Sequence, residues 1–180
     1  MRGDGDALSN VREGVREWIG LEAKPVSPLY ALLAESCLAV GEITEGLSAA
    51  NGGLAAIAPT LDRFAEAELW RLKGELLLAR SCRQGQLRGR PLRPSEEVEG
   101  CFREALEIAR RQGARAFELR AATSLVKLDR LRGIRGESHT RLGELAARLQ
   151  EGLDTPDLVQ AQRLLAERDK RHPTPQPRRC

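Results

Sequence analysis

Aromatic residues are scarce in this 180-residue sequence: they make up 3% of it, although hydrophobic residues as a class make up 41%. A core built from this composition must consist mainly of Ala, Leu and Val, which suits closely packed helices. Residues that favour strands are too sparse for a large sheet. The composition therefore predicts an all-α fold.

Long apolar runs are also missing. No stretch of about 18 apolar residues occurs, so no membrane-spanning helix is expected. Residues 1–6 lack the apolar stretch of a signal peptide. These two absences predict a soluble, cytoplasmic protein that has no contact with a membrane.

Metal-binding patterns are absent too. The four cysteines form no C-x-x-C pair, and neither of the two histidines, His139 and His172, lies near a cysteine pair. A zinc site needs about four such ligands, so no metal is expected. Cys37 and Cys101 fall within apolar helical patterns and are expected to be small core residues.

Motifs that carry catalysis are missing as well. The sequence contains no G-x-x-x-x-G-K-[S/T] phosphate-binding loop, no G-x-S-x-G and no H-E-x-x-H. Carboxylate pairs such as Glu96 and Glu97 lie at helix starts, where their negative charge interacts favourably with the helix dipole. We therefore expect no enzymatic activity and no cofactor.

The basic charge is concentrated in two segments. The chain carries a net charge of +3, but residues 168–180 hold five basic residues and one acid (5 − 1 = +4), which leaves 3 − 4 = −1 for residues 1–167. Residues 81–94 add four arginines and no acid. An alternative hypothesis is therefore a nucleic-acid-associated regulator that uses this loop and tail. A nucleic-acid interface would normally be a patch on the folded surface, which makes this the less favoured interpretation.

Apolar residues at three- and four-residue steps predict a series of helices. Gly41, Gly113 and Gly133 are expected to end helices, whereas Gly52 and Gly53 either break one helix or allow a neighbour to approach closely. The predicted helices span 6–19, 27–40, 43–58, 60–81, 95–112, 114–132, 136–151 and 155–167.

A spacing repeats along this series. Tyr30-x-x-Leu33-Ala34-x-x-Cys37 recurs 40 residues later as Trp70-x-x-Lys73-Gly74-x-x-Leu77, and Ala122-x-x-Leu125-Val126 gives a third copy. Each of the first two copies is followed by a second pattern of small and large residues, Gly46-x-x-x-Ala50-x-x-Gly53 and Val98-x-x-x-Phe102-x-x-Ala105. Removing a 12-residue insertion between Leu77 and Val98 brings all three units into one register. A fixed period of this size is typical of solenoids, in which each unit is a helix pair that cannot bury its own apolar face.

The residue types in this pattern resemble the tetratricopeptide repeat (TPR), and the best match is Trp70, Gly74, Phe102 and Ala105. Lys73, Val98 and Gly53 depart from that pattern. Segments 65–78, 101–114, 118–125 and 151–158 also look like the C-terminal repeat array of large bacterial signalling ATPases, some of which carry a nucleotide cyclase domain. This resemblance, over about 26–167, implies a regulatory or scaffolding module that binds a protein or peptide, or the ATPase or cyclase domains of a larger polypeptide.

The resemblance and the composition together predict an organisation. Residues 1–25 would form an N-terminal helix, in the place of the second helix of an incomplete repeat. Residues 26–153 would form three helix pairs with the basic loop 81–94, residues 154–167 a capping helix, and residues 168–180 a disordered tail. The whole would be a right-handed superhelix of seven or eight helices. In TPR arrays the first helix of each pair lines a concave groove, which here would be formed by Glu35, Leu38, Arg71, Glu75, Leu78, Arg120, Lys127 and Arg130.

Overall fold

A computed structural model describes residues 3–20, 26–88, 94–134, 136–149 and 155–167. Within these ranges the chain forms eight α-helices and no strand, which confirms the all-α prediction. The helices are α1 (Gly3–Gly20), α2 (Ser27–Val40), α3 (Ile43–Thr60), α4 (Glu66–Arg88), α5 (Glu96–Gln112), α6 (Arg115–Arg132), α7 (Glu137–Arg148) and α8 (Pro156–Ala166). No helix in the described part of the chain has the length and apolar character needed to cross a membrane.

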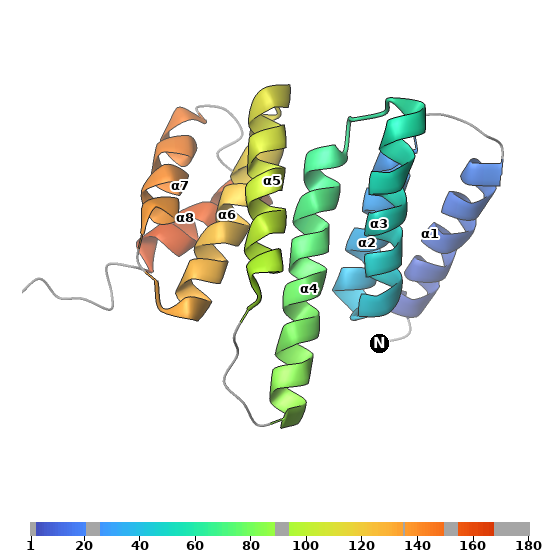
Figure 1. The fold of residues 1–180 in the computed structure, drawn as a ribbon, viewed down its shortest axis with the longest axis horizontal. Coiled ribbons are helices and arrows are strands. Elements are labelled where there is room, and N and C mark those ends of the chain that lie inside the picture. The colour runs from blue at the N-terminus through green and yellow to red at the C-terminus, as the bar shows by residue number, and fades with distance from the viewer. Residues whose placement is uncertain (1–2, 21–25, 89–93, 135, 150–154, 168–180) are drawn as a thin grey trace, which may run out of the picture.

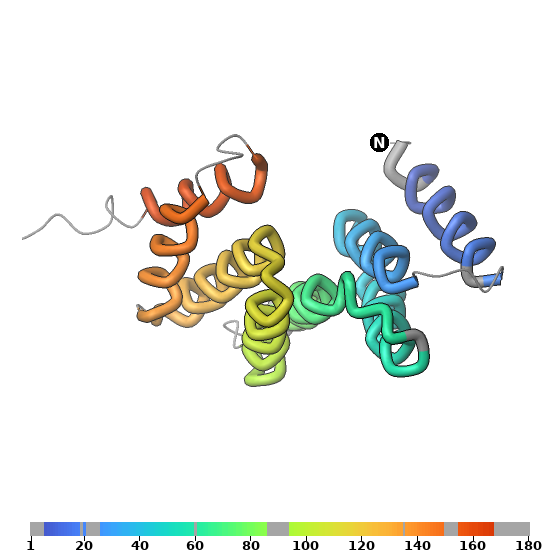
Figure 2. The backbone as a smooth tube through the Cα atoms, turned by 90° about the horizontal axis from the view of Figure 1, so that it is seen from above, coloured from blue at the N-terminus to red at the C-terminus, as the bar shows by residue number. Residues whose placement is uncertain are grey.

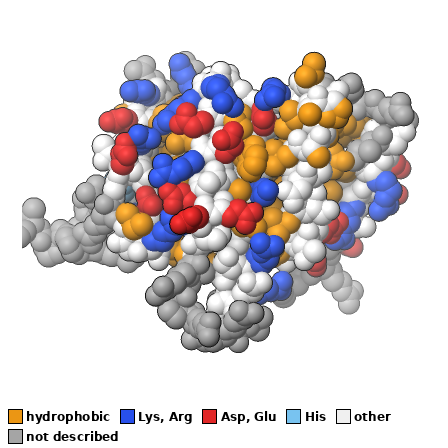
Figure 3. All heavy atoms as spheres, viewed as in Figure 1, with side chains coloured by type: hydrophobic (Ala, Val, Ile, Leu, Met, Phe, Trp, Pro, Cys, Tyr) orange, Lys and Arg blue, Asp and Glu red, His pale blue; other side chains and the backbone are white. Residues whose placement is uncertain are grey.

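Each helix packs against the next one along the chain, so the helices form a row from α1 to α8 (Figure 1). The even-numbered helices also pack against one another in order, α2 on α4, α4 on α6 and α6 on α8. The odd-numbered α3, α5 and α7 lie on the other side of the row. On that outer face, hydrophobic side chains gather around the junction of α3 and α4, and charged ones gather toward α5 and α7 (Figure 3).

Three helices end where the sequence predicts. Gly41, Gly113 and Gly133 follow α2, α5 and α6 with φ angles of 82°, 65° and 70°. Each glycine N–H bonds back to carbonyls of the last turn, in a left-handed conformation that residues with a Cβ adopt only at a cost. These glycines set the length of the three helices.

The core consists of Leu, Ala and a few larger residues, and helix crossings depend on glycine. Helix α3 runs without a break through Gly52 and Gly53. A Cβ on Gly53 would lie 2.7 Å from the Tyr30 Cβ and 2.8 Å from a Leu69 methyl. The pair of glycines therefore allows close approach, as in the second of the two sequence-based alternatives. Cys37 and Cys101 are buried in this core, as predicted.

The boundary between α3 and α4 differs from the prediction. The sequence predicts a helix that begins at Thr60, but Pro59 and Thr60 form the last turn of α3, and α4 begins at Glu66. The intervening Asp62 accepts hydrogen bonds from the backbone N–H groups of Val26 (2.9 Å) and Ser27 (2.7 Å). In return, Ser27 Oγ accepts one from the Ala65 N–H (3.2 Å). The two helix starts therefore cap each other across 35 residues or more.

The predicted basic loop at 81–94 is also partly wrong. Helix α4 continues to Arg88, because Gln, Arg and Leu are good helix formers and Cys82 still packs against a core cluster. The lower end of α4 consequently extends beyond its neighbours (Figure 1). Residues 89–93 and the predicted disordered tail 168–180 lie outside the described residues.

Candidate functional site

The eight residues predicted to line a groove all lie on α2, α4 and α6, the even-numbered helices that pack in order. Seen from above, α1 and α8 turn toward the same side of the row at its two ends (Figure 2). Two adjoining cavities occur on the surface formed by these helices, which we call the inner face.

The smaller cavity is polar and has a volume of about 160 Å³. We call it the polar cavity. Four of its lining residues were predicted, and the others come from α6 and α8. The lining residues are Glu35, Arg71, Arg120, Thr123, Ser124, Lys127, Asp157 and Gln160.

A buried carboxylate organises this cavity. Glu68 is only 4% exposed and accepts hydrogen bonds from Arg71 Nη2 (2.6 Å) and Arg120 Nη1 (2.9 Å). Arg120 also donates from Nε to Asp157 of α8 (2.7 Å). The Ser124 hydroxyl donates to Glu75 (2.6 Å). Because a buried charge needs partners, the network ties α4, α6 and α8 together.

The pKa shifts follow from this pairing. Burial acts to raise the pKa of the Glu68 carboxyl, but its ion pairs with Arg71 and Arg120 outweigh that effect and the pKa is lowered. Burial acts in the opposite sense on the two guanidinium groups, and their carboxylate partners hold both pKa values above the ordinary one. These groups stay ionised at neutral pH, whereas a general acid or base needs a pKa near the working pH. The network therefore gives the cavity fixed charges that do not change near neutral pH.

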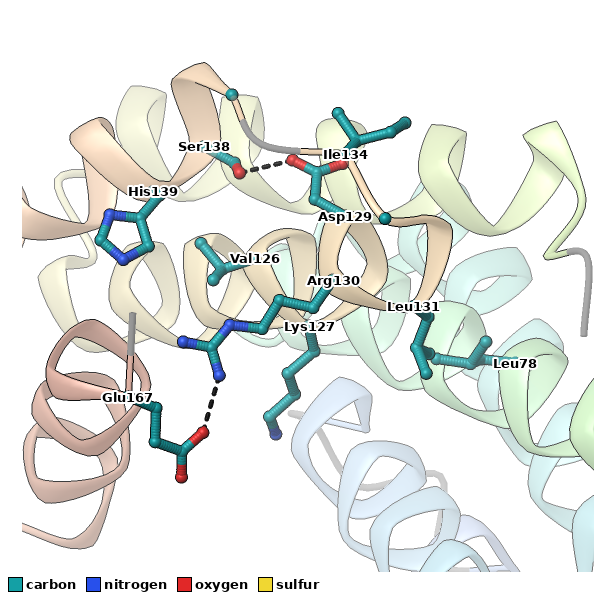
Figure 4. A pocket seen from close by; sticks show the side chains of 12 residues that line it. Leu78, Val126, Lys127, Asp129, Arg130, Leu131, Ile134, Ser138, His139 and Glu167 are labelled. Atoms are coloured by element: carbon teal, nitrogen blue, oxygen red, sulfur yellow. Dashed lines mark hydrogen bonds and ion pairs between the residues drawn. The ribbon is translucent and has the colours of Figure 1, made fainter. Parts of the chain in front are cut away.

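The larger cavity is mainly apolar and has a volume of about 670 Å³. We call it the apolar cavity; it lies along the C-terminal half of α6 and the turn into α7 (Figure 4). Its apolar wall comes from Leu78, Val126, Leu131 and Ile134, and its charged rim from Lys127, Asp129, Arg130 and Glu167. Arg130 pairs with Glu167, the residue that follows α8 (2.8 Å), and Ser138 donates to Asp129.

Lys127 lines both cavities, so they adjoin along α6, and we call the two together the groove. Seven of the eight predicted residues line this groove or bond to a residue that does, Glu75 being held below it by Ser124. Leu38 is the exception, because it lines neither cavity and packs against the core of the first helices.

Sequence reasoning missed the contribution of α8. Asp157, Gln160 and Glu167 lie in a segment that was interpreted only as a cap. Glu68 was missed too, although its position three residues before Arg71 places both on one helix face. That spacing was the one signal in the sequence that could have identified it.

Other candidate chemistry receives no support in the part of the chain that the structure covers. Within it, no group of three or more His, Cys, Asp or Glu side chains is placed to hold a metal ion. Of the four arginines in segment 81–94, only the exposed Arg83 has a described side chain, so the nucleic-acid hypothesis stays a prediction. Comparison with protein-family models, curated proteins and solved structures gives no match for this chain.

Proposed function

We propose that this chain is a TPR-like α-solenoid module that binds a protein or peptide on its inner face. The observation that carries the proposal is the ordered packing of α2, α4, α6 and α8, whose side chains line one groove. Solenoids of helix pairs use such extended inner surfaces for recognition.

Contacts at the helix crossings support the repeat. The units are α2–α3, α4–α5 and α6–α7, followed by α8. In the second unit, Gly74 lies directly against the ring of Phe102, the two positions that the TPR pattern reserves for a small and a large residue. Lys73, which departs from that pattern, has its ammonium 5.1 Å from the centre of the Trp70 ring, a cation–π contact.

The wider proposal is a regulatory or scaffolding role related to bacterial signalling ATPases. Three of the segments that carry that resemblance, 65–78, 101–114 and 118–125, fall on α4, α5 and α6, which pack consecutively. The bound partner would then be a separate protein, or the ATPase or cyclase domain of a larger polypeptide. The ion-paired floor of the groove fits binding better than catalysis.

Site-specific photocrosslinking tests the proposal. A photoreactive amino acid is placed in cells at exposed groove positions, Glu35 or Gln160, and at exposed outer positions, Asn51 of α3 or Glu104 of α5. We expect one protein, identified by mass spectrometry, to crosslink from the groove positions and not from the outer ones. Crosslinks from the outer face alone would refute the proposal. So would DNA or RNA affinity that falls steeply with salt and requires residues 168–180.

A further inference from the structure

The two cavities differ in chemistry and meet at Lys127, so a ligand that fills both must change in character along its length. We propose that the groove binds an extended peptide segment carrying, in this order, a bulky apolar, an acidic and a basic side chain. This inference rests on the proposed function and specifies the ligand of the same site.

The apolar position follows from the apolar cavity. Leu131 and Ile134 are each 49% exposed, although Leu78 and Val126 behind them are buried. A volume of about 670 Å³ falls within the range of about 300–1,000 Å³ that is usual for ligand sites. A ligand side chain placed there covers two half-exposed apolar residues, which favours binding by the hydrophobic effect.

The acidic position follows from Lys127. The other cations of the groove already have anionic partners: Arg71 and Arg120 share Glu68, and Arg130 pairs with Glu167. Within the described residues, the contact made by the Lys127 ammonium is with the neutral Gln160 Oε1, at 3.2 Å. An ammonium has three donors. A ligand carboxylate beside Lys127 would therefore give this cation its ionic partner.

The basic position follows from Glu35 on the α2 wall of the polar cavity. Its side chain is exposed, and none of the described residues forms a hydrogen bond or ion pair with it. Glu35 lines the polar cavity but not the apolar cavity, whereas Lys127 lines both. The sequence of ligand groups is therefore fixed: apolar, then acidic beside Lys127, then basic beside Glu35.

The length of the groove favours a peptide. It follows α6 and the turn after it for the seven residues from Ile134 to Lys127, about 10 Å at about 1.5 Å per residue, and then crosses α4 toward Glu35 on α2, so it extends over more than about 10 Å. An extended chain advances about 3.3 Å per residue and presents alternate side chains on one face. Five residues with the pattern apolar-x-acidic-x-basic fit this span.

Two fluorescein-labelled peptides of identical composition test the order of charges. Both have a Gly/Ser host; one contains Leu-Ser-Glu-Ser-Lys and the other Leu-Ser-Lys-Ser-Glu. By fluorescence anisotropy in low salt, we expect the first to bind about fivefold more tightly, because partly exposed ion pairs are individually weak. About 1 M salt should abolish the preference, since the Debye length is then about 3 Å.

Protein variants make the test sharper. The double variant K127E/E35K should prefer the second peptide, because both charges of the groove are reversed. Ile134→Ser should weaken both peptides about tenfold, since it removes part of the apolar wall. The matched control Phe64→Ser, at a 69% exposed site outside the groove, should leave both affinities unchanged. Circular dichroism verifies that each variant is folded.

Equal affinity for the two peptides, no binding of either, or an unchanged preference in the double variant would each overturn the inference. The proposed function survives any of these results if groove positions still crosslink to a protein. It fails separately, through the crosslinking experiment.

Discussion

The contact between Gly74 and Phe102 makes a quantitative prediction about the α4–α5 crossing. A Cβ built on Gly74 would lie 2.5, 2.7 and 3.1 Å from three carbons of the Phe102 ring, and that ring is fully buried. Forcing a methyl group into a packed core costs about 1–3 kcal/mol. With three overlaps we expect the upper end, about 3 kcal/mol.

Helix propensity opposes this cost. Alanine is favoured over glycine inside a helix by about 1 kcal/mol, so Gly74→Ala should lower the free energy of unfolding by about 2 kcal/mol. In a chain of this size, about 1 kcal/mol corresponds to about 2–4 °C. The melting temperature should therefore fall by about 4–8 °C, as measured by differential scanning calorimetry.

Gly100→Ala is the matched control, because Gly100 lies inside α5 and a Cβ added there would meet no atom within 4 Å apart from the adjoining backbone of its own helix. Only the propensity gain applies there, so the melting temperature should rise by about 2–4 °C. In a Phe102→Leu background the smaller side chain relieves the overlap, and Gly74→Ala should cost less than half as much. Equal effects of the two alanine substitutions would refute the proposed crossing.

Two other substitutions test the ionic and capping contacts. Glu68→Gln leaves Arg71 and Arg120 short of a buried partner and should cost about 3 kcal/mol at pH 7 by urea denaturation. Because the folded-state pKa of Glu68 is lowered from 4.5, its contribution to the free energy of unfolding is fully present above about pH 5 and is lost as the pH falls. The stabilities of wild type and variant should therefore converge in acid, and parallel plots of stability against pH would contradict this. Asp62→Ala removes the acceptor for the N–H groups that begin α2 and should cost about 1 kcal/mol, with faster amide exchange at Ser27; unchanged exchange there would contradict the reciprocal capping.

The sequence predicted helix ends and helix spans correctly where residues within the same helix determine them. Gly41, Gly113 and Gly133 end helices because the left-handed conformation needs no distant partner. The apolar periodicity located α5 and α6 to within one residue at each end, since each carries its core positions at regular steps.

The predictions failed where a distant residue decides the structure. The start of α4 depends on Ser27, 38 residues away, and no local rule identifies that acceptor. Segment 81–94 was interpreted from its Arg, Gly and Pro content, whereas its first eight residues have enough helix propensity to extend α4. The contribution of α8 to the groove could not be predicted either, because the ion pairs Arg120–Asp157 and Arg130–Glu167 each join residues 37 positions apart.

Helix geometry explains why the repeat does not identify the ligand. On α4 the residues that make the repeat visible are Trp70, Gly74 and Leu77, at steps of four and three. Residues one position further along, Arg71, Glu75 and Leu78, line the groove or the network below it. Successive residues are about 100° apart around a helix, so the two stripes face different directions. Packing between helix pairs constrains the first stripe to small and large apolar residues, whereas the second faces the groove and the ion-pair network below it. Variation at Glu35, Lys127 and Ile134 should therefore change the ligand and leave the fold intact, whereas a single methyl group at Gly74 should do the reverse.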